Sequence, residues 1–390
     1  MAVFDIMVLG CGGGPNEHNL SAYLLKPREQ PWHEGIIALE AGSGVGALDA
    51  ILRRNPTAFG RRPSEGPSNA ASHYTAHEVY SWIRCFLITH GHLDHVNSLV
   101  LSAGSLKGPA RRIYAARETL EDLESVFSDR CWPNLASWKD DDSENALVYS
   151  VLATDREYHS ITKDVSVLPM PLSHGKTRTN TLYKSTAFFL RHTPSKQELL
   201  FFGDVEPDSI ASTPLTHDVW RTAAPKIVAK TLSTIFIECS WPSGRQSDML
   251  YGHLDPEHLC EELTALAKAV VHARQQQGSS TGSPGTQSPA RKRQKTDEGS
   301  GRSASSGEPP ITGVLKGVRV YIMHCKDDVR GRFDEPIHQV ITDQVYKLVD
   351  DMQLGAEIIA VEQGMHICIG IRHYQTQRRG VLQTKADVNA

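Results

Sequence analysis

The fold is decided by one short stretch, Thr89-His90-Gly91-His92-Leu93-Asp94-His95. It directly follows the apolar residues 84–89, which read as a buried β-strand. Imidazole nitrogens and carboxylate oxygens are ligands that zinc accepts. In a tight turn containing glycine, we expect His90 and His92 to face one metal ion, and Asp94 and His95 to face a second. The alternative is a solvated polar loop, which gives no reason for histidines to crowd together behind an apolar strand.

Two metal ions need more ligands than these four residues supply, and three candidates lie farther along the chain. His174, Asp204 and His324 each follow a short apolar run. Because neighbouring strand ends converge at one rim of a sheet, we assign His174 to the first metal and His324 to the second, with Asp204 as a bridging carboxylate. Taken singly, each residue is more often structural; their joint appearance favours the metal site.

Two further residues are candidates for catalysis that do not bind metal, in addition to the ligand Asp94. Glu238 follows the apolar run 232–237, and His253 precedes a predicted helix that begins at Pro256. A helix N-terminus attracts anions such as phosphate. We therefore expect His253 to contact a phosphoryl oxygen or to protonate a leaving oxygen, with Glu238 or another carboxylate orienting it. The alternatives are a helix-capping His253 and a solvated Glu238.

A glycine-rich stretch follows the first predicted strand, and it reads Gly10-Cys11-Gly12-Gly13-Gly14-Pro15-Asn16. Pro15 stands where a dinucleotide-binding fingerprint needs its third glycine, so that interpretation is weak. The stretch is more typical of a tight strand exit near a functional rim. Asn16 and Asn19 are candidates for substrate contacts, and a role confined to the turn is an equal alternative.

The composition indicates a globular protein with a large core. The chain has 390 residues, of which 39% are hydrophobic, and a formal net charge of −4. This balance argues against a nucleic-acid or membrane-surface partner. No apolar run approaches the roughly 20 residues of a membrane helix. The N-terminus lacks a basic signal-peptide region, and the seven cysteines are scattered singly; both features favour reduced thiols in the cytosol or nucleus.

Alternating apolar runs and helical patterns predict one α/β domain over residues 1–390, with two sheets between helices. Two segments interrupt it. Residues 53–76 read as a loop insertion, and residues 275–312 are rich in Ser, Gly, Pro and Gln and predict a disordered insertion. The basic cluster at 291–295 lies in the second segment. It predicts a nuclear-localisation signal, and a plain solvating charge run is the alternative.

The motif at residues 90–101 closely resembles the signature of the class II 3′,5′-cyclic-nucleotide phosphodiesterases, which belong to the metallo-β-lactamase superfamily. Four other segments resemble the same family: Val8 to Pro15, Pro171 to Gly175, Phe202 to Asp204, and Tyr251 to Leu254. The resemblance implies an αββα sandwich, two zinc ions and hydrolysis of cAMP or cGMP. The chain departs from the family at Ala103-Gly104 and at Glu40, where an aspartate is usual, and we expect neither departure to touch a proposed ligand.

The implied mechanism is attack on phosphorus by a hydroxide bridging two zinc ions, which yields a 5′-nucleoside monophosphate. Manganese or iron is an alternative to zinc. One alternative function is a tRNA 3′-processing endonuclease on the same fold, and another is a non-catalytic scaffold that binds partners through residues 275–312. The expected location is cytoplasmic, with nuclear as an alternative because of the cluster at 291–295. The sequence does not predict the oligomeric state.

Overall fold

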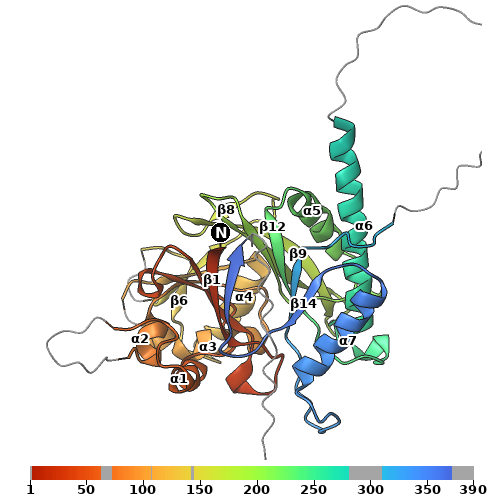
Figure 1. Cartoon of the computed structure of the whole chain (residues 1–390). Helices are drawn as coiled ribbons and strands as arrows, with labels where there is room; N and C mark the ends of the chain where they lie inside the picture. The colour runs from red at the N-terminus through yellow and green to blue at the C-terminus, as the bar shows by residue number, and fades with distance from the viewer. Residues whose placement is uncertain (1, 63–72, 107, 142–144, 281–309, 371–390) are drawn as a thin grey trace, which may run out of the picture.

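Two β-sheets packed face to face form the centre of the molecule, and helices cover both outer faces (Figure 1). The computed structural model describes residues 2–62, 73–106, 108–141, 145–280 and 310–370. Over these ranges one sheet has eight strands and the other has seven. The predicted order of layers, with two sheets between helices, is confirmed.

The first sheet comes mainly from the N-terminal half and has the order β15-β1-β2-β3-β4-β5-β7-β6. Antiparallel pairing joins β15, β1, β2 and β3, and parallel pairing joins β3, β4, β5 and β7. Its strands are β1 (Ala2–Gly10), β2 (Ala22–Pro27), β3 (Ile36–Leu39), β4 (Ile83–Leu87), β5 (Arg111–Ala115), β6 (Ala136–Ser137), β7 (Leu147–Val151) and β15 (His366–Gly370).

The second sheet has the order β14-β13-β12-β11-β10-β9-β8. Strand β10 is antiparallel to both β9 and β11, while β11 to β14 are mutually parallel. Strands β9, β11, β12 and β13 therefore run in one direction and end at one edge. The strands are β8 (His159–Ser160), β9 (Val165–Lys176), β10 (Leu182–His192), β11 (Glu198–Phe202), β12 (Leu232–Glu238), β13 (Arg319–Met323) and β14 (Glu357–Ala360).

Helices α1 to α4 pack on the first sheet and helices α5 to α7 on the second. They are α1 (Val45–Arg54), α2 (Ala76–Ser81), α3 (Leu93–Ser102), α4 (Arg117–Val126), α5 (Thr216–Val228), α6 (Pro256–Ser280) and α7 (Ile337–Asp351), with 3-10 turns η1 (Glu17–Asn19), η2 (Trp32–Glu34), η3 (Ala103–Ser105) and η4 (Ser247–Met249). Among the described residues, no helix combines the length and the apolar character needed to cross a bilayer.

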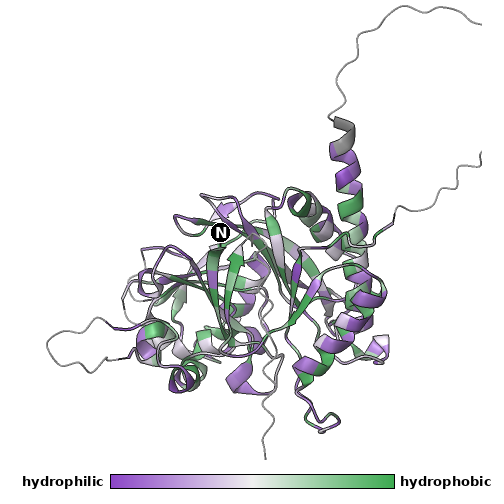
Figure 2. Ribbon diagram, in the orientation of Figure 1, coloured by the Kyte–Doolittle hydropathy of each residue, from purple (hydrophilic) through white to green (hydrophobic). Residues whose placement is uncertain are grey.

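The core has three layers because side chains alternate along each strand. In β1, Phe4 and Ile6 face the second sheet, whereas Met7 and Leu9 face the helices. Figure 2 shows the resulting concentration of hydrophobic residues in the strands, with hydrophilic residues on the outer helix faces. Burial on both faces explains why the strands are nearly continuous apolar runs in the sequence.

Helix α6 forms where the sequence predicts it. Asp255 caps its first turn, since Asp255 Oδ1 accepts a hydrogen bond from the backbone N–H of His258 at 3.0 Å, and Pro256 takes the first helical position. Leu259 and Leu263 then recur at helical spacing and are fully buried. Strands β10 and β11 form an antiparallel hairpin.

The predicted insertion boundaries are wrong at three ends. Helix α1 continues through Arg54, and Phe59 is buried against Trp32 at a ring distance of 5.2 Å. Helix α6 continues to Ser280, because the glutamines after Arg274 are good helix formers. Ile311 packs against the core. Residues 63–72 and 281–309, including the basic cluster at 291–295, lie outside the described residues.

Candidate metal centre

Seven histidine and aspartate side chains from four strand ends and one helix meet between the two sheets. His174 lies near the end of β9, Asp204 follows β11, and His324 follows β13. These three strands run in one direction, so their carboxyl ends share one edge of the sheet. His90 follows β4 of the facing sheet. Sheet packing thus joins residues more than 200 positions apart in the chain, such as His95 and His324.

The histidine motif is only partly a turn. His90 precedes the helix and His92 has extended backbone, but Leu93 begins helix α3, so Asp94 and His95 lie in its first turn. The prediction of one tight turn for all four residues is wrong at this point. The helix starts early because Val96, Leu99 and Val100 recur at helical spacing and are buried against the first sheet.

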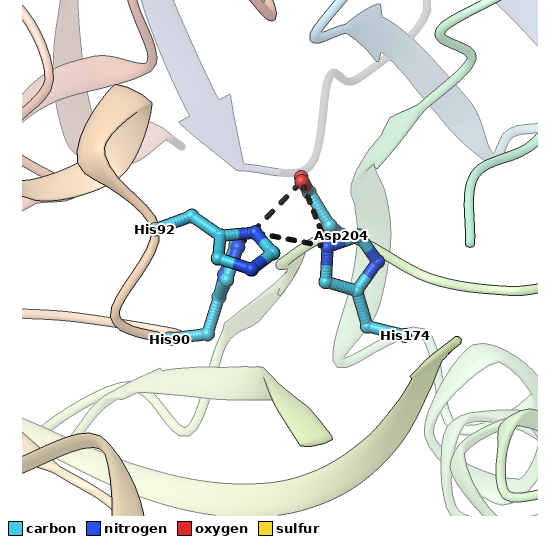
Figure 3. A group of neighbouring side chains, drawn as sticks. All are labelled: His90, His92, His174 and Asp204. Carbon is cyan, nitrogen blue, oxygen red and sulfur yellow. Dashed lines mark hydrogen bonds and ion pairs between the residues drawn. The ribbon is translucent and has the colours of Figure 1, made fainter. Parts of the chain in front are cut away.

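One group of potential ligands contains His90, His92, His174 and Asp204 (Figure 3). His92 Nδ1 lies 3.2 Å from His174 Nε2. Asp204 Oδ2 lies 3.6 Å from His90 Nε2 and 3.6 Å from His174 Nε2. These atoms point toward a common centre, and the group is the one that the sequence assigned to the first metal.

A second group contains Asp94, His95 and His324. His324 Nε2 lies 3.0 Å from His95 Nε2 and 3.3 Å from Asp94 Oδ2. Asp204 adjoins this group as well, with Oδ1 3.4 Å from His324 Nε2. Asp204 therefore lies between the two groups, as a bridging carboxylate would.

The distances fit metal ligands. A tetrahedral zinc ion with nitrogen ligands at 2.0–2.1 Å holds those ligands about 3.3 Å apart. The separations of 3.2–3.6 Å in the first group match this value. In addition, Nε2 of His90 is buried and has no hydrogen-bond partner among the described residues. A buried polar atom without a partner is costly, and a metal ion would satisfy it.

The electrostatics also favour cations. Burial lowers the pKa of His90 well below its ordinary value and that of His174 to about 3, so both rings stay neutral with lone pairs available. Burial opposes a proton on His95 too, but Asp204 and Glu40 outweigh it and hold the pKa of His95 well above its ordinary value. A metal ion would displace that proton.

Glu238 and His253 form a buried pair beside the centre. Glu238 Oε1 lies 3.0 Å from Nδ1 of His253, and Glu238 is completely buried rather than solvated. Burial and the nearby charge of Asp204 raise the pKa of Glu238 to about 7, and burial lowers that of His253 to about 3. His253 Nε2 makes no hydrogen bond within the described residues, which leaves it free to contact a ligand.

The sequence interpretation missed two supporting residues. Glu40 Oε2 lies 3.4 Å from Nδ1 of His95, so the expectation that this departure touches no proposed ligand is wrong. Its position directly after β3 was the available signal. Tyr183 stacks on His92 at 4.6 Å, and its hydroxyl donates to Asp122. No local sequence pattern marks Tyr183, because β10 brings it to the site from a different part of the chain.

The glycine-rich stretch forms a wall beside the centre. Asn16 Oδ1 accepts from the backbone N–H of His18 and Asn19 Oδ1 accepts from that of Cys11, both at 3.1 Å, so both asparagines make turn contacts. A cleft of about 600 Å³ opens next to the wall and reaches Asp94. A cavity of this size suits a small molecule.

Comparisons with known proteins were made for both sequence and structure. A family model described as cAMP phosphodiesterases class-II matches residues 57–364. The 3′,5′-cyclic-nucleotide phosphodiesterase of Schizosaccharomyces pombe is 33% identical over 279 residues, which cover 68% of this chain and 76% of that protein. The 3′,5′-cyclic-nucleotide phosphodiesterase 1 of Saccharomyces cerevisiae is 28% identical over 312 residues, covering 68% and 83%.

Solved structures show the same fold. Unliganded yeast PDE1 superposes with a TM-score of 0.73 at 24% identity, covering 95% of this chain and all of that chain. The metallo-beta-lactamase fold protein YhfI from Bacillus subtilis gives a TM-score of 0.50 at 11% identity, covering 94% and 99%. The predicted metallo-β-lactamase-type fold is therefore confirmed.

Proposed function

We propose that the histidine–aspartate centre between the two sheets hydrolyses cAMP, and also cGMP, to 5′-nucleoside monophosphates. The proposal starts from the family: the chain belongs to the class II cAMP phosphodiesterases and is a 3′,5′-cyclic-nucleotide phosphodiesterase. The family match favours this function over the tRNA-processing and scaffold alternatives.

The observation that carries the proposal is the position of Asp204. Its carboxylate lies 3.4–3.6 Å from ligand nitrogens of both groups. In the proposed assignment, His90, His92 and His174 would hold one metal ion, Asp94, His95 and His324 would hold the other, and Asp204 would be shared between them. Two zinc ions bound there would supply a hydroxide at neutral pH and positive charge for the phosphodiester.

The protein contributes a proton donor and an ordered environment. Glu238 lies against Nδ1 of His253, so a proton shared between them would move onto Nδ1 as Nε2–H gives its own proton to the departing O3′ of the ribose. Glu40 and Tyr183 fix the rings of His95 and His92. Such partners orient ligands and set which ring nitrogen carries the proton.

The test is hydrolysis of cAMP and cGMP by the purified chain, with and without a chelator, together with elemental analysis. We expect about two metal ions per chain and loss of activity on chelation, and the metal found identifies zinc, manganese or iron. His92→Ala and Asp94→Ala should abolish turnover and keep the circular dichroism of the wild type. Full cAMP hydrolysis by either variant would refute the assignment of that residue as a metal ligand.

A further inference from the structure

The cleft beside the metal centre has one basic side chain among the acidic residues Glu17, Asp94 and Asp327. Its walls come from the glycine-rich stretch, the start of α3 and the loop after β13, and Lys326 is the sole basic residue among the described residues that line it. Asp94, a proposed ligand, lines the same cleft. A dianionic or monoanionic phosphate held at the centre would therefore face this ammonium group.

Lys326 is held in place by the glycine-rich stretch. Its Nζ donates to the carbonyl oxygen of Gly13 at 2.8 Å, and its backbone N–H donates to Ser240 at 3.0 Å. Gly13 must be glycine here, because a Cβ would lie 2.7 Å from the ring of His324. The stretch thus packs closely against the ring of His324 and supplies the carbonyl that holds the lysine, which gives the motif a function beyond a strand exit.

The lysine has hydrogen-bonding capacity left over. An ammonium group has three donors, and Gly13 takes one. The nearest carboxylate is Asp94, whose Oδ2 lies 3.9 Å from Nζ. A metal ion bound to Asp94 would neutralise most of the charge of that carboxylate. The ammonium group of Lys326 would then lie beside two cations, which is unfavourable unless an anion lies between them. A phosphoryl oxygen in the cleft would supply the anion.

The indole of Trp241 forms another wall of the cleft. Its Nε1 donates to the carbonyl of Leu250 at 2.9 Å, which fixes the ring. The guanidinium of Arg245 lies 3.6 Å from the ring centroid, but Arg245 lines only a neighbouring hollow. Arg245 therefore covers one face of the indole, and the part of the ring that lines the cleft is a rigid aromatic surface. Such surfaces stack on nucleobases of any kind.

Resting on the proposed function, we propose that Lys326 binds a non-bridging phosphoryl oxygen of the cyclic nucleotide and that Trp241 is the surface on which the base stacks. The phosphate end of the substrate then lies at Asp94 and Lys326, and the nucleoside extends along the cleft toward the indole. Lys326 stabilises the extra charge that develops on phosphorus during ring opening.

The test compares a charged and an uncharged ligand in Lys326→Met, Lys326→Arg and Trp241→Ala. Turnover of cAMP and calorimetric binding of 5′-AMP and adenosine are measured on the metal-loaded protein. Lys326→Met should lower kcat/KM on the order of 10- to 100-fold and weaken 5′-AMP binding, with adenosine binding and metal content unchanged. Lys326→Arg should restore most of both. Trp241→Ala should weaken both ligands by about 10-fold. Lys347→Met, on the exposed side of α7, is the matched control.

Two results would overturn the inference. If Lys326→Met keeps the wild-type kcat/KM, the proposed phosphate contact is refuted. If this variant loses 5′-AMP binding and adenosine binding equally, Lys326 only supports the glycine-rich stretch. If Trp241→Ala binds adenosine with unchanged affinity, the proposed stacking of the base on Trp241 is refuted. A wild-type protein that binds two metals and hydrolyses neither cyclic nucleotide defeats the proposed function instead, and the binding comparison still decides the role of Lys326.

Discussion

Replacing Glu238 by glutamine measures how far turnover depends on a charged partner for His253. Glu238 accepts hydrogen bonds from Val205 N at 2.8 Å, Ser240 Oγ at 2.5 Å and Leu254 N at 3.5 Å, and its Oε1 shares a proton with His253 Nδ1 at 3.0 Å. A glutamine oxygen can still accept from His253 and Val205, and its amide can face the hydroxyl of Ser240, which rotates. The substitution therefore removes the charge and keeps the packing.

The expected loss follows from that change. In the proposed step the proton shared by Glu238 and Nδ1 moves onto His253 as Nε2 loses its own, so Glu238 becomes charged in the transition state. A hydrogen bond to a charged group contributes about 1.5–3 kcal/mol, and glutamine can supply neither that charge nor the proton. Losing this contribution lowers kcat roughly 10- to 150-fold. KM should change little because Glu238 does not line the cleft. His253→Ala, which removes the acid itself, should cost about 10²- to 10⁴-fold.

The assay is steady-state cAMP hydrolysis, with metal content and thermal midpoint measured on each variant. Glu262→Gln is the matched control, because Glu262 is a second buried carboxylate whose pKa is raised by burial. It accepts a hydrogen bond from Trp220 Nε1 at 2.7 Å and is not part of the metal centre. We expect its kcat to match that of the wild type. If Glu238→Gln keeps wild-type kcat, or if its activity falls only in proportion to lost metal, the acid role of the pair is refuted.

Three further predictions concern the metals and the fold. Asp204→Ala should reduce bound metal below two ions per chain in elemental analysis, because both ligand groups share this carboxylate; unchanged stoichiometry would contradict a bridging role. Asp5→Asn should destabilise the fold by about 3–5 kcal/mol in urea unfolding, because it leaves Lys26, 2.9 Å away, as a buried charge without its partner. Burial raises the pKa of Asp5, but bonds to His366 and Lys26 outweigh it and hold the pKa below its ordinary value. The ionised form therefore stabilises the fold above about pH 4, and the difference between variant and wild type should shrink as the pH falls below that value. Leu263→Ala should cost about 2–5 kcal/mol, since Leu263 is fully buried under the second sheet; a cost below 1 kcal/mol would show that this core is loosely packed.

Local patterns were enough to predict much of the fold. The strands β1, β3, β4 and β10 to β14 are apolar runs bounded by turn residues, and α6 has a cap, a proline and a helical repeat. The start of α3 was not predicted, because a run of metal-ligand residues masked the apolar spacing that begins at Val96. Strands β2, β5 and β7 were also missed, since their pairing depends on neighbours distant in sequence.

Short-range patterns already show which residue types end the strands, because histidines and acids stand where apolar runs stop. Which of these residues meet depends on how the two sheets pack. The contact of Glu40 with His95, the stacking of Tyr183 on His92 and the tie between Gly13 and Lys326 all join distant segments. Such contacts arise from the packing of one sheet on another, and no spacing along the chain encodes the distance between two sheets.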